Sequence, residues 1–518
     1  MSLSVTSLRV VIVKPSKYDE RGFVERFRRG FMPNSTVPYI ASMTPHELRE
    51  TRCEVHAVDE YVQTDLDYLS LFEAERGRET LVALVGVQSH QLHRALDLAA
   101  LAVDRGAHAV IGGPHPMTCD TEVLQGRGVA FSLSEAELVW PRILEDALSG
   151  GLQPVYGREE RWQQQLRSPV LRPPARRDLR RYAVPMLGIY PARGCPYSCT
   201  FCSVIKIAGH AVRSQPIETT LASLRAAKAA GVKFVMFTSD NLNKCPDVRA
   251  LAEAMIAQRI ELPFFAQCDA QIHRDPDLVR LLARAGCFQM FVGAESFNAA
   301  TLRGAHKFHN DPGKYARIVA LCRENGITTH FSNILGFPAD TERGILEHLS
   351  TLRALGPDVA SFYILTPIPG TEQYDDFRRD GWITETNLDR FDGTTVTWRH
   401  PNLANEDLRR LLSRCCRDFY PLGGIASKLW RIIRRRRDFR SFASLFSVSG
   451  FSAMSRMAGI FGHHPMAGGI GRVRKDRAAD YAGLRRRVFG IDRAPLPSSL
   501  PLSRADEEIN RRAKLVPA

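Results

Sequence analysis

The sequence predicts an α/β protein with two parallel-sheet units and a mainly helical C-terminal segment. Over the first 150 residues, short apolar, β-branched runs alternate with stretches of helical periodicity. Six further strand and helix pairs follow within residues 185–400. Such alternation is typical of parallel sheets whose strands are joined by helices. We therefore expect an open, doubly wound parallel sheet first, and then a curved, partial (β/α)6 barrel of the TIM type.

The length and local composition of the chain divide it into four parts. At 518 residues it is too long for one ordinary hydrophobic core. The expected boundaries are a doubly wound domain at 1–150, a linker rich in proline and arginine at 151–184, the barrel at 185–400, and a helical, basic segment at 401–518.

The N-terminal domain shows five buried-strand patterns and two helical ones. The strands are expected at residues 8–13, 54–58, 80–87, 109–111 and 129–132, and the helices at 92–104 and 137–148. Open sheets of this kind bind ligands beyond the carboxyl ends of their strands. Residues 14–45 are expected to form a long loop, which is either a substrate or cofactor flap or a surface insertion.

The barrel strands are expected at residues 186–190, 234–238, 264–268, 290–292, 328–335 and 360–365. In such barrels the chemistry gathers at the carboxyl ends of the strands. The polar residues at these ends are Ser239, Asp240, Asn241, Gln267, Asp269, Glu295, Ser296 and Asn333. Strand ends are commonly polar, so each is also compatible with an ordinary rim position. Glu295 stands out, because a carboxylate directly after an apolar strand must find a donor.

Three cysteines follow the first barrel strand at C-x3-C-x2-C spacing: Cys195, Cys199 and Cys202. Three thiolates on one short loop cannot all pair as disulfides, but they can converge on one metal centre. A four-iron cluster normally has four cysteine ligands, so three leave one iron open, much as a catalytic zinc keeps one free position. A zinc knuckle is the alternative, but no fourth Cys or His follows at zinc spacing.

With Phe201 just before the last cysteine, this loop resembles the cluster loop of the radical S-adenosylmethionine (radical SAM) enzymes. The resemblance implies a [4Fe-4S] cluster on the three cysteines, S-adenosylmethionine on the open iron, and reductive cleavage to an adenosyl radical. It also implies which residues contact S-adenosylmethionine: Phe201 in the loop, Ser239, Asp240 and Asn241 near its amine, and Glu295 and Ser296 near its ribose. Residues 336–338, residues 367–371, Arg213 and Lys307 match motifs of the cobalamin-associated branch, although either charge could be an ordinary surface charge.

The order of elements in residues 1–150 resembles the cobalamin-binding-type domain that precedes many radical SAM domains. The resemblance implies cobalamin beside Gly112 and Gly113, where small residues let the backbone approach a flat corrin ring. Two departures stand out. The D-x-H-x-x-G motif that supplies a cobalt-ligating histidine is absent, and the usual Gly-Glu-x-Glu turn appears as Ser-Glu-Ala-Glu at 134–137. The alternative is a domain that has lost cofactor binding and only shapes the substrate cleft.

Histidines near the carboxyl ends of the N-terminal strands are not expected to bind metal. His90 and His93 could share one ion only if their helix began early, and His115 is not expected to ligate cobalt.

These resemblances imply a radical SAM enzyme that generates a substrate carbon radical and, with cobalamin, methylates a carbon of a small or lipid-like metabolite. No residue is assigned a catalytic role. One alternative is a cobalamin-type radical SAM enzyme that catalyses oxidation, cyclisation or rearrangement without methyl transfer. Another is a non-catalytic, cluster-containing sensor. The chemistry needs an external electron donor of the flavodoxin or ferredoxin type.

The formal net charge of +14 is concentrated near the C-terminus, where an arginine run at 431–440 is interleaved with apolar side chains. A basic amphipathic helix can lie on an anionic membrane, so residues 428–446 could give peripheral contact with the inner membrane surface. A solvated face or an acidic partner is the alternative. Nucleic acid is not expected, since no recognised nucleic-acid fold accompanies the run. Residues 493–518 are expected to be extended.

The remaining features favour a cytoplasmic protein. No apolar run reaches the roughly 18 residues of a membrane span. The N-terminus shows no signal-peptide pattern. The other cysteines are scattered, which suits a reducing compartment better than a disulfide framework.

Overall fold

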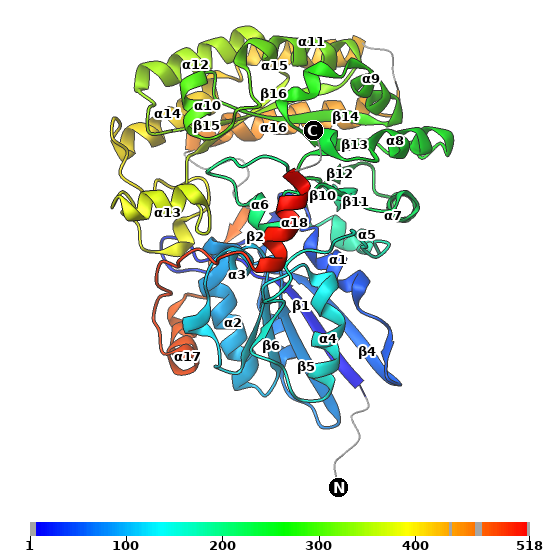
Figure 1. The fold of residues 1–518 in the computed structure, drawn as a ribbon, viewed down its shortest axis with the longest axis vertical. Helices are drawn as coiled ribbons and strands as arrows, with labels where there is room; N and C mark the ends of the chain where they lie inside the picture. Colours follow the sequence, from blue (N-terminus) through cyan, green and yellow to red (C-terminus); the bar gives the residue numbers. More distant parts are fainter. Residues whose placement is uncertain (1–6, 435–437, 462–468, 515–518) are drawn as a thin grey trace.

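The computed structural model describes residues 7–434, 438–461 and 469–514. It contains two large sheets, one in each half of the molecule, and the C-terminal part of the chain returns along both (Figure 1). Both sheets are parallel except that β3 pairs antiparallel with β4 at the edge of the first. The predicted fold class is confirmed: a doubly wound N-terminal unit, a partial barrel and a mainly helical C-terminal segment.

The N-terminal sheet has seven strands in the order β3-β4-β1-β5-β6-β7-β8. Their bounds are β1 (Ser7–Lys14), β3 (Glu47–Leu48), β4 (Thr51–Asp59), β5 (Arg78–Leu84), β6 (His108–Gly112), β7 (Val129–Ser132) and β8 (Val155–Tyr156). Alternate residues of β1 face opposite sides, because side chains alternate along a strand. Val11 and Val13 pack with helix α2 (Leu92–Asp104), while Val10 and Ile12 pack with α4 (Ala136–Leu148). This double packing makes the sheet doubly wound.

One expectation about the loops in this half is wrong. Residues 14–45 are not a long loop, because they contain strand β2 (Arg26–Gly30) and helix α1 (Thr36–Met43). The partner of β2 is β17 (Gly469–Val473), which comes from the far end of the chain, so no local pattern could reveal the pairing. Within the expected linker, β8 extends the N-terminal sheet by pairing with β7, and α5 (Arg176–Leu179) follows.

The second sheet has six parallel strands in the order β16-β15-β14-β13-β12-β9. They are β9 (Leu187–Ile189), β12 (Val235–Phe237), β13 (Phe264–Cys268), β14 (Cys287–Glu295), β15 (Thr328–Leu335) and β16 (Val359–Ile364). The helices between them are α7 (Ile217–Ala229), α8 (Val248–Ala257), α9 (Pro276–Ala285), α10 (Ala299–Gly304), α11 (Tyr315–Glu324) and α12 (Glu342–Leu355). Strands β9 and β16 do not pair with each other, so the barrel stays open, as predicted.

The C-terminal segment packs on both units. Its helices are α14 (Asn405–Asp418), α15 (Leu422–Arg434), α16 (Ser441–Phe461), α17 (Ala479–Phe489) and α18 (Arg504–Lys514). On α16, Phe446 packs against Phe234, which also contacts Phe288, where strands of the barrel begin. Helix α17 packs on α2 of the N-terminal unit. No helix in the described ranges has both the length and the apolar character to span a bilayer.

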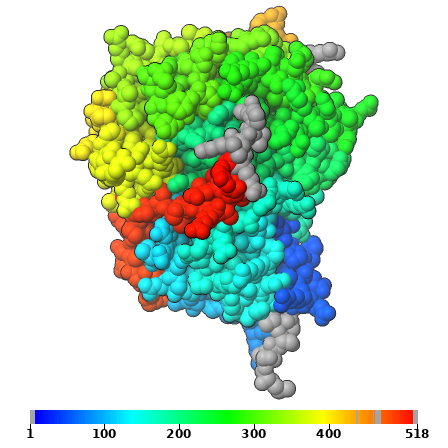
Figure 2. Space-filling view, viewed as in Figure 1, coloured from blue at the N-terminus to red at the C-terminus, as the bar shows by residue number. Residues whose placement is uncertain are grey.

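The last described residues form a strap across the two units, coloured red in Figure 2. Leu500 N donates to Thr118 O of the N-terminal unit, and Tyr374 of helix α13 (Glu372–Arg379) donates to Pro497 O. The expectation of an extended tail is therefore only half right, because α18 begins at Arg504. Its Asp506 is buried and bound to Arg161.

Candidate functional site

The cysteine loop sits at the rim of the partial barrel, between two short strands, β10 (Ala192–Arg193) and β11 (Arg213–Ser214), which pair antiparallel. Gly194 has φ +106, and a Cβ there would lie 2.1 Å from Ala211 O, so only glycine fits at this position. Cys195 N donates to Gly209 O at 3.1 Å, and the short helix α6 (Val204–Ile207) follows the loop. The paired strands β10 and β11, called the β10–β11 ribbon below, therefore hold the backbone of the loop in place at Cys195.

None of the three loop cysteines forms a disulfide. Burial raises the pKa of Cys195 and Cys202 to about 12 and that of Cys199 to about 11, and the neighbouring thiols add to each shift. The three sulfurs are thus close enough to influence one another, and their protons must leave when metal binds. No group of three or more His, Cys, Asp or Glu in the described residues converges on a single ion. A cluster makes no such demand, because each thiolate binds a different iron, so this donor set fits an iron–sulfur cube.

Glu295 ends β14 beside this loop. Its Oε1 lies 3.3 Å from Lys307 Nζ, and its Oε2 accepts a hydrogen bond from Ser332 Oγ at 3.0 Å, so the expected donors exist. Glu295 has φ +60, which a non-glycine residue rarely adopts, at a register shift between β14 and β15. Lys307 Nζ also lies 5.7 Å from the centre of the Phe201 ring. Burial disfavours the charge of Lys307, but Glu295, Cys199 and Cys202 outweigh burial and raise its pKa.

The polar group after the second barrel strand also reaches the loop. Asp240 Oδ2 accepts from Gly194 N at 2.9 Å, and burial raises the pKa of Asp240. Asn241 Nδ2 lies 2.8 Å from Asp269 Oδ2 and 4.0 Å from Cys195 Sγ. The hydroxyl of Ser239 is buried without a hydrogen-bond partner in the structure. The Ser296 hydroxyl, in contrast, accepts from Asn298 N at the start of α10.

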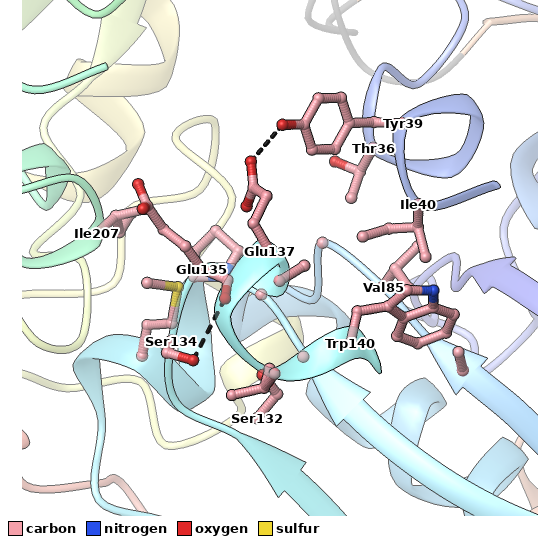
Figure 3. A pocket seen from close by; sticks show the side chains of 18 of the residues that line it. Thr36, Tyr39, Ile40, Val85, Ser132, Ser134, Glu135, Glu137, Trp140 and Ile207 are labelled. Carbon is pink, nitrogen blue, oxygen red and sulfur yellow. Dashed lines mark hydrogen bonds between the residues drawn. The ribbon is translucent and has the colours of Figure 1, made fainter. Parts of the chain in front are cut away.

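A cavity of about 280 Å³ lies between the two units (Figure 3). Its walls come from Gly112, Ser132 and Trp140 on one side and from Tyr190 and Asp240 on the other. Gly113 also lines it, but at φ +138 its Cβ would lie 2.1 Å from Val87 N. Glycine is required at position 113 by contact with its own chain, not by the approach of a ligand.

A second cavity, of about 650 Å³, adjoins the first and shares Thr36 and Tyr190 with it. Its lining is more polar, with Lys14, Lys17, Asp59, Gln88, His90 and Tyr363 among its residues. Burial lowers the pKa of His90 to about 3, so its imidazole is neutral.

The other histidines near this edge have protein partners. His93 contacts Asp389 and accepts from Ala494 N, while His115 contacts Ser89 Oγ. The ring nitrogens of His93 and His115 therefore face protein groups.

Two arginines of the β10–β11 ribbon bind the acidic turn of the N-terminal unit. Arg213 Nη2 and Nη1 lie 2.9 and 3.0 Å from the two carboxylate oxygens of Glu135. Arg193 lies 3.0 Å from Glu137. Arg213 is therefore buried where the two units meet, a contact that we call the seam, and is not exposed as a surface charge. The sequence pattern does not single out Arg193. The one local signal is its position, two residues before Cys195.

Residues 189–352 match the model of the Radical SAM superfamily. The match runs from β9 through the cysteine loop into α12. Residues 189–352 therefore form a radical SAM domain. This domain accordingly uses a [4Fe-4S] cluster and S-adenosylmethionine, and the protein is an enzyme.

Several curated methyltransferases are similar to this radical SAM protein. It is 26% identical over 370 residues to bacteriochlorophyllide d C-8(2)-methyltransferase of Chlorobaculum tepidum, a match that covers 68% of this chain and 77% of the relative. It is also 26% identical over 195 residues to hopanoid C-3 methylase of Methylococcus capsulatus, covering 37% and 36% of the two chains.

Two solved structures share the fold of this radical SAM protein. The radical S-adenosylmethionine methyltransferase TsrM from Kitasatospora setae, with cobalamin and [4Fe-4S] cluster bound, superimposes with a TM-score of 0.60 at 16% identity, covering 87% of this chain and all of that one (100%). The cobalamin-dependent enzyme OxsB with aqua-cobalamin bound gives a TM-score of 0.55 at 13% identity, covering 88% and 72%.

Proposed function

We propose that this radical SAM enzyme methylates a carbon of a small or lipid-like metabolite and uses cobalamin as the methyl carrier. The observation that carries the proposal is the pair of adjoining cavities between the ligand edge of the doubly wound sheet and the barrel, the smaller of which is lined by Arg193 and Ile207 on either side of the cysteine loop. Relatives named as methyltransferases and the fold shared with TsrM and OxsB support it. When bound, cobalamin supplies the methyl group.

The cavities fit a large ligand with two chemically different parts. The smaller one is lined mostly by apolar groups such as Val85, Trp140 and Ile143, and the larger one by hydrogen-bonding groups. Gly112 lies on the wall of the smaller cavity, where its missing side chain leaves the backbone open to a ligand. Both cavities are lined by Tyr190, and the smaller one also by Arg193 of the β10–β11 ribbon, so a ligand there would lie near the cysteine loop.

We assign the cluster to Cys195, Cys199 and Cys202. When bound there, the cluster and S-adenosylmethionine would supply the radical chemistry needed to remove hydrogen from an unactivated carbon. The proposed contacts to S-adenosylmethionine are Phe201, Ser239, Asp240, Asn241, Glu295 and Ser296. The buried hydroxyl of Ser239, which lacks a protein partner, supports a polar ligand there. At the opposite end of the barrel, Phe446 of α16 packs against Phe234.

The proposed partners are an external electron donor of the flavodoxin or ferredoxin type and an anionic membrane surface. Trp430 and Ile433 of α15 and Phe442 of α16 are 57%, 51% and 62% exposed. Arg434 lies 4.1 Å from the Trp430 ring, so cationic and apolar groups share this surface. Residues 435–437 of the arginine run lie outside the described residues.

Anaerobic purification with cobalamin supplied tests the proposal. We expect corrinoid and iron–sulfur bands together in the visible spectrum. With a strong reductant and S-adenosylmethionine, both 5′-deoxyadenosine and S-adenosylhomocysteine should form. 5′-Deoxyadenosine without S-adenosylhomocysteine would favour radical chemistry without methyl transfer. An intact cluster with neither product would favour a sensor, and Cys199→Ala is the cluster-deficient control.

A further inference from the structure

Arg193 links the wall of the smaller cavity to the cysteine loop. It stands two residues before Cys195, and its side chain is 14% exposed. Its Nη2 lies 3.0 Å from Glu137 Oε1, and its Nη1 lies 3.2 Å from Glu137 Oε2 and 3.4 Å from Glu135 Oε1. A guanidinium that faces two carboxylate oxygens in this way is held in a defined orientation.

Two aromatic rings hold the same guanidinium from other directions. The rings of Tyr39 and Tyr190 lie 5.2 and 5.1 Å from the Arg193 Cζ atom. The Tyr39 hydroxyl donates to Glu137, as the dashed line in Figure 3 shows. Burial disfavours charge on Glu137, but Arg193 outweighs it and holds the pKa of Glu137 below its ordinary value. Glu137 is therefore an anion in this setting.

The next residue, Gly194, is held by Asp240 through its backbone N–H at 2.9 Å. Tyr39, Glu137, Tyr190, Arg193 and Asp240 all line the smaller cavity. A ligand in that cavity would touch the side chains that fix the backbone immediately before Cys195. Any ligand that stabilises one arrangement of these residues must favour the same arrangement of the loop, and the effect must be reciprocal.

We propose that the Arg193–Glu137 pair couples the cavity to the cluster loop, so that cobalamin and the [4Fe-4S] cluster each strengthen the binding of the other. Both are positioning residues, because they act through the loop and not on the reacting atoms. The inference rests on the proposed use of cobalamin. It assigns to the acidic turn of the N-terminal unit a role in cluster assembly in addition to holding the two units together.

The test measures hydroxocobalamin affinity in protein with and without the reconstituted cluster, by quenching of tryptophan fluorescence. Trp140 lines the cavity, so a bound corrinoid should quench its emission. For the wild type we expect binding to be at least about fivefold tighter with the cluster present. In Glu137→Gln and in Arg193→Lys the ratio of cobalamin affinities with and without the cluster should fall to near one. The double variant should lose nothing more, because both changes break one link.

Glu145→Gln is the matched control. Glu145 lies on the same helix, but its side chain is 42% exposed and pairs with Arg49. It should keep the wild-type ratio. Iron content and circular dichroism show whether each variant folds and holds its cluster.

Binding that does not depend on the cluster in the wild type, or a wild-type ratio in Glu137→Gln, overturns the coupling and leaves the proposed function intact. If no form binds cobalamin while S-adenosylmethionine cleavage persists, the cobalamin part of the proposed function fails, and the coupling fails with it.

Discussion

Lys307 Nζ lies 3.3 Å from Glu295 Oε1, and the two side chains are only 11% and 9% exposed. Ser332 donates to the other carboxylate oxygen of Glu295, and the thiols of Cys199 and Cys202 influence the charge of Lys307. A buried ion pair is costly to break from one side, because the remaining charge has no partner.

Replacing Lys307 with Met should lower the free energy of unfolding by ~3–5 kcal/mol. Anaerobic urea denaturation of the protein before cluster reconstitution measures the loss. Adding Glu295→Gln to Lys307→Met should recover part of it, because the unpaired charge is then removed. A loss below about 1 kcal/mol in the single variant, typical of exposed pairs, would contradict the assignment.

Gly370→Ala should loosen the seam between the units. Gly370 has φ +94, and a Cβ there would lie 2.5 Å from Thr118 Cβ. The strain and the clash together should cost ~2–4 kcal/mol of stability. Gly381→Ala is the matched control, because it has φ +68 and open space around it, and it should cost only ~1 kcal/mol. Equal losses in the two variants would show that the Thr118 contact is unimportant.

Asp506→Asn should release the strap. Asp506 is fully buried, 3.3 Å from Arg161 Nε, and it also accepts from the backbone N–H of Arg161. The substitution leaves a buried guanidinium without its anion, so we expect a loss of ~3–5 kcal/mol. Limited proteolysis should cut residues 490–514 much faster than in the wild type. Glu508→Gln, at an exposed ion pair with Arg511, should be cut at the wild-type rate.

Lys14 should make stability depend on pH. Burial lowers its pKa from 10.5 to about 7 in the folded protein. Between about pH 7 and pH 10.5 the unfolded chain therefore binds more protons, so the free energy of unfolding rises with pH in that window. Below pH 7, Lys14 is protonated in both the folded and the unfolded protein, so its contribution no longer changes with pH. Urea denaturation from pH 6 to 9.5 should show the rise in the wild type and not in Lys14→Met. The same pH dependence of the free energy of unfolding in the wild type and in Lys14→Met would contradict this role of Lys14.

The exposed surface of α15 should bind anionic vesicles. The variant Trp430→Ser/Ile433→Ser should partition at least about tenfold less onto phosphatidylglycerol vesicles in sedimentation assays, because each apolar side chain contributes ~1.5 kcal/mol or more when buried. Phe308→Ser is the control, since Phe308 is 70% exposed but lies outside α15 and α16. Equal binding to pure phosphatidylcholine would argue against an electrostatic contribution.

Much of the candidate site could be predicted because its residues follow strands directly. Once β9, β12 and β14 are located, the carboxyl ends of parallel strands must meet at one rim. That rule brought Asp240, Asn241 and Glu295 to the cysteine loop without any knowledge of distances. It could not show that the Ser296 hydroxyl accepts from Asn298 N or that Gly113 packs on Val87, because these are contacts of a few ångströms that depend on how the loops fold.

The interior of the seam was not predictable in the same way. Arg213 and the acidic turn that contains Glu135 match family motifs, but nothing in the local sequence shows that they bind each other, and Arg193 appears in the sequence as an ordinary charged residue. Their contacts form only where the two units meet and bury them together. The pairing of β2 with β17 was hidden for the same reason, since its two strands lie near opposite ends of the chain.

By itself, the sequence determined the two parallel sheets and the cysteine loop, because hydrophobic periodicity and short spacings are local properties of a chain. Tertiary structure alone decided the strap of residues 490–514, the two cavities and the arginine–glutamate contacts between the units. These depend on how distant surfaces meet, and burial at that meeting turns common charges into specific partners.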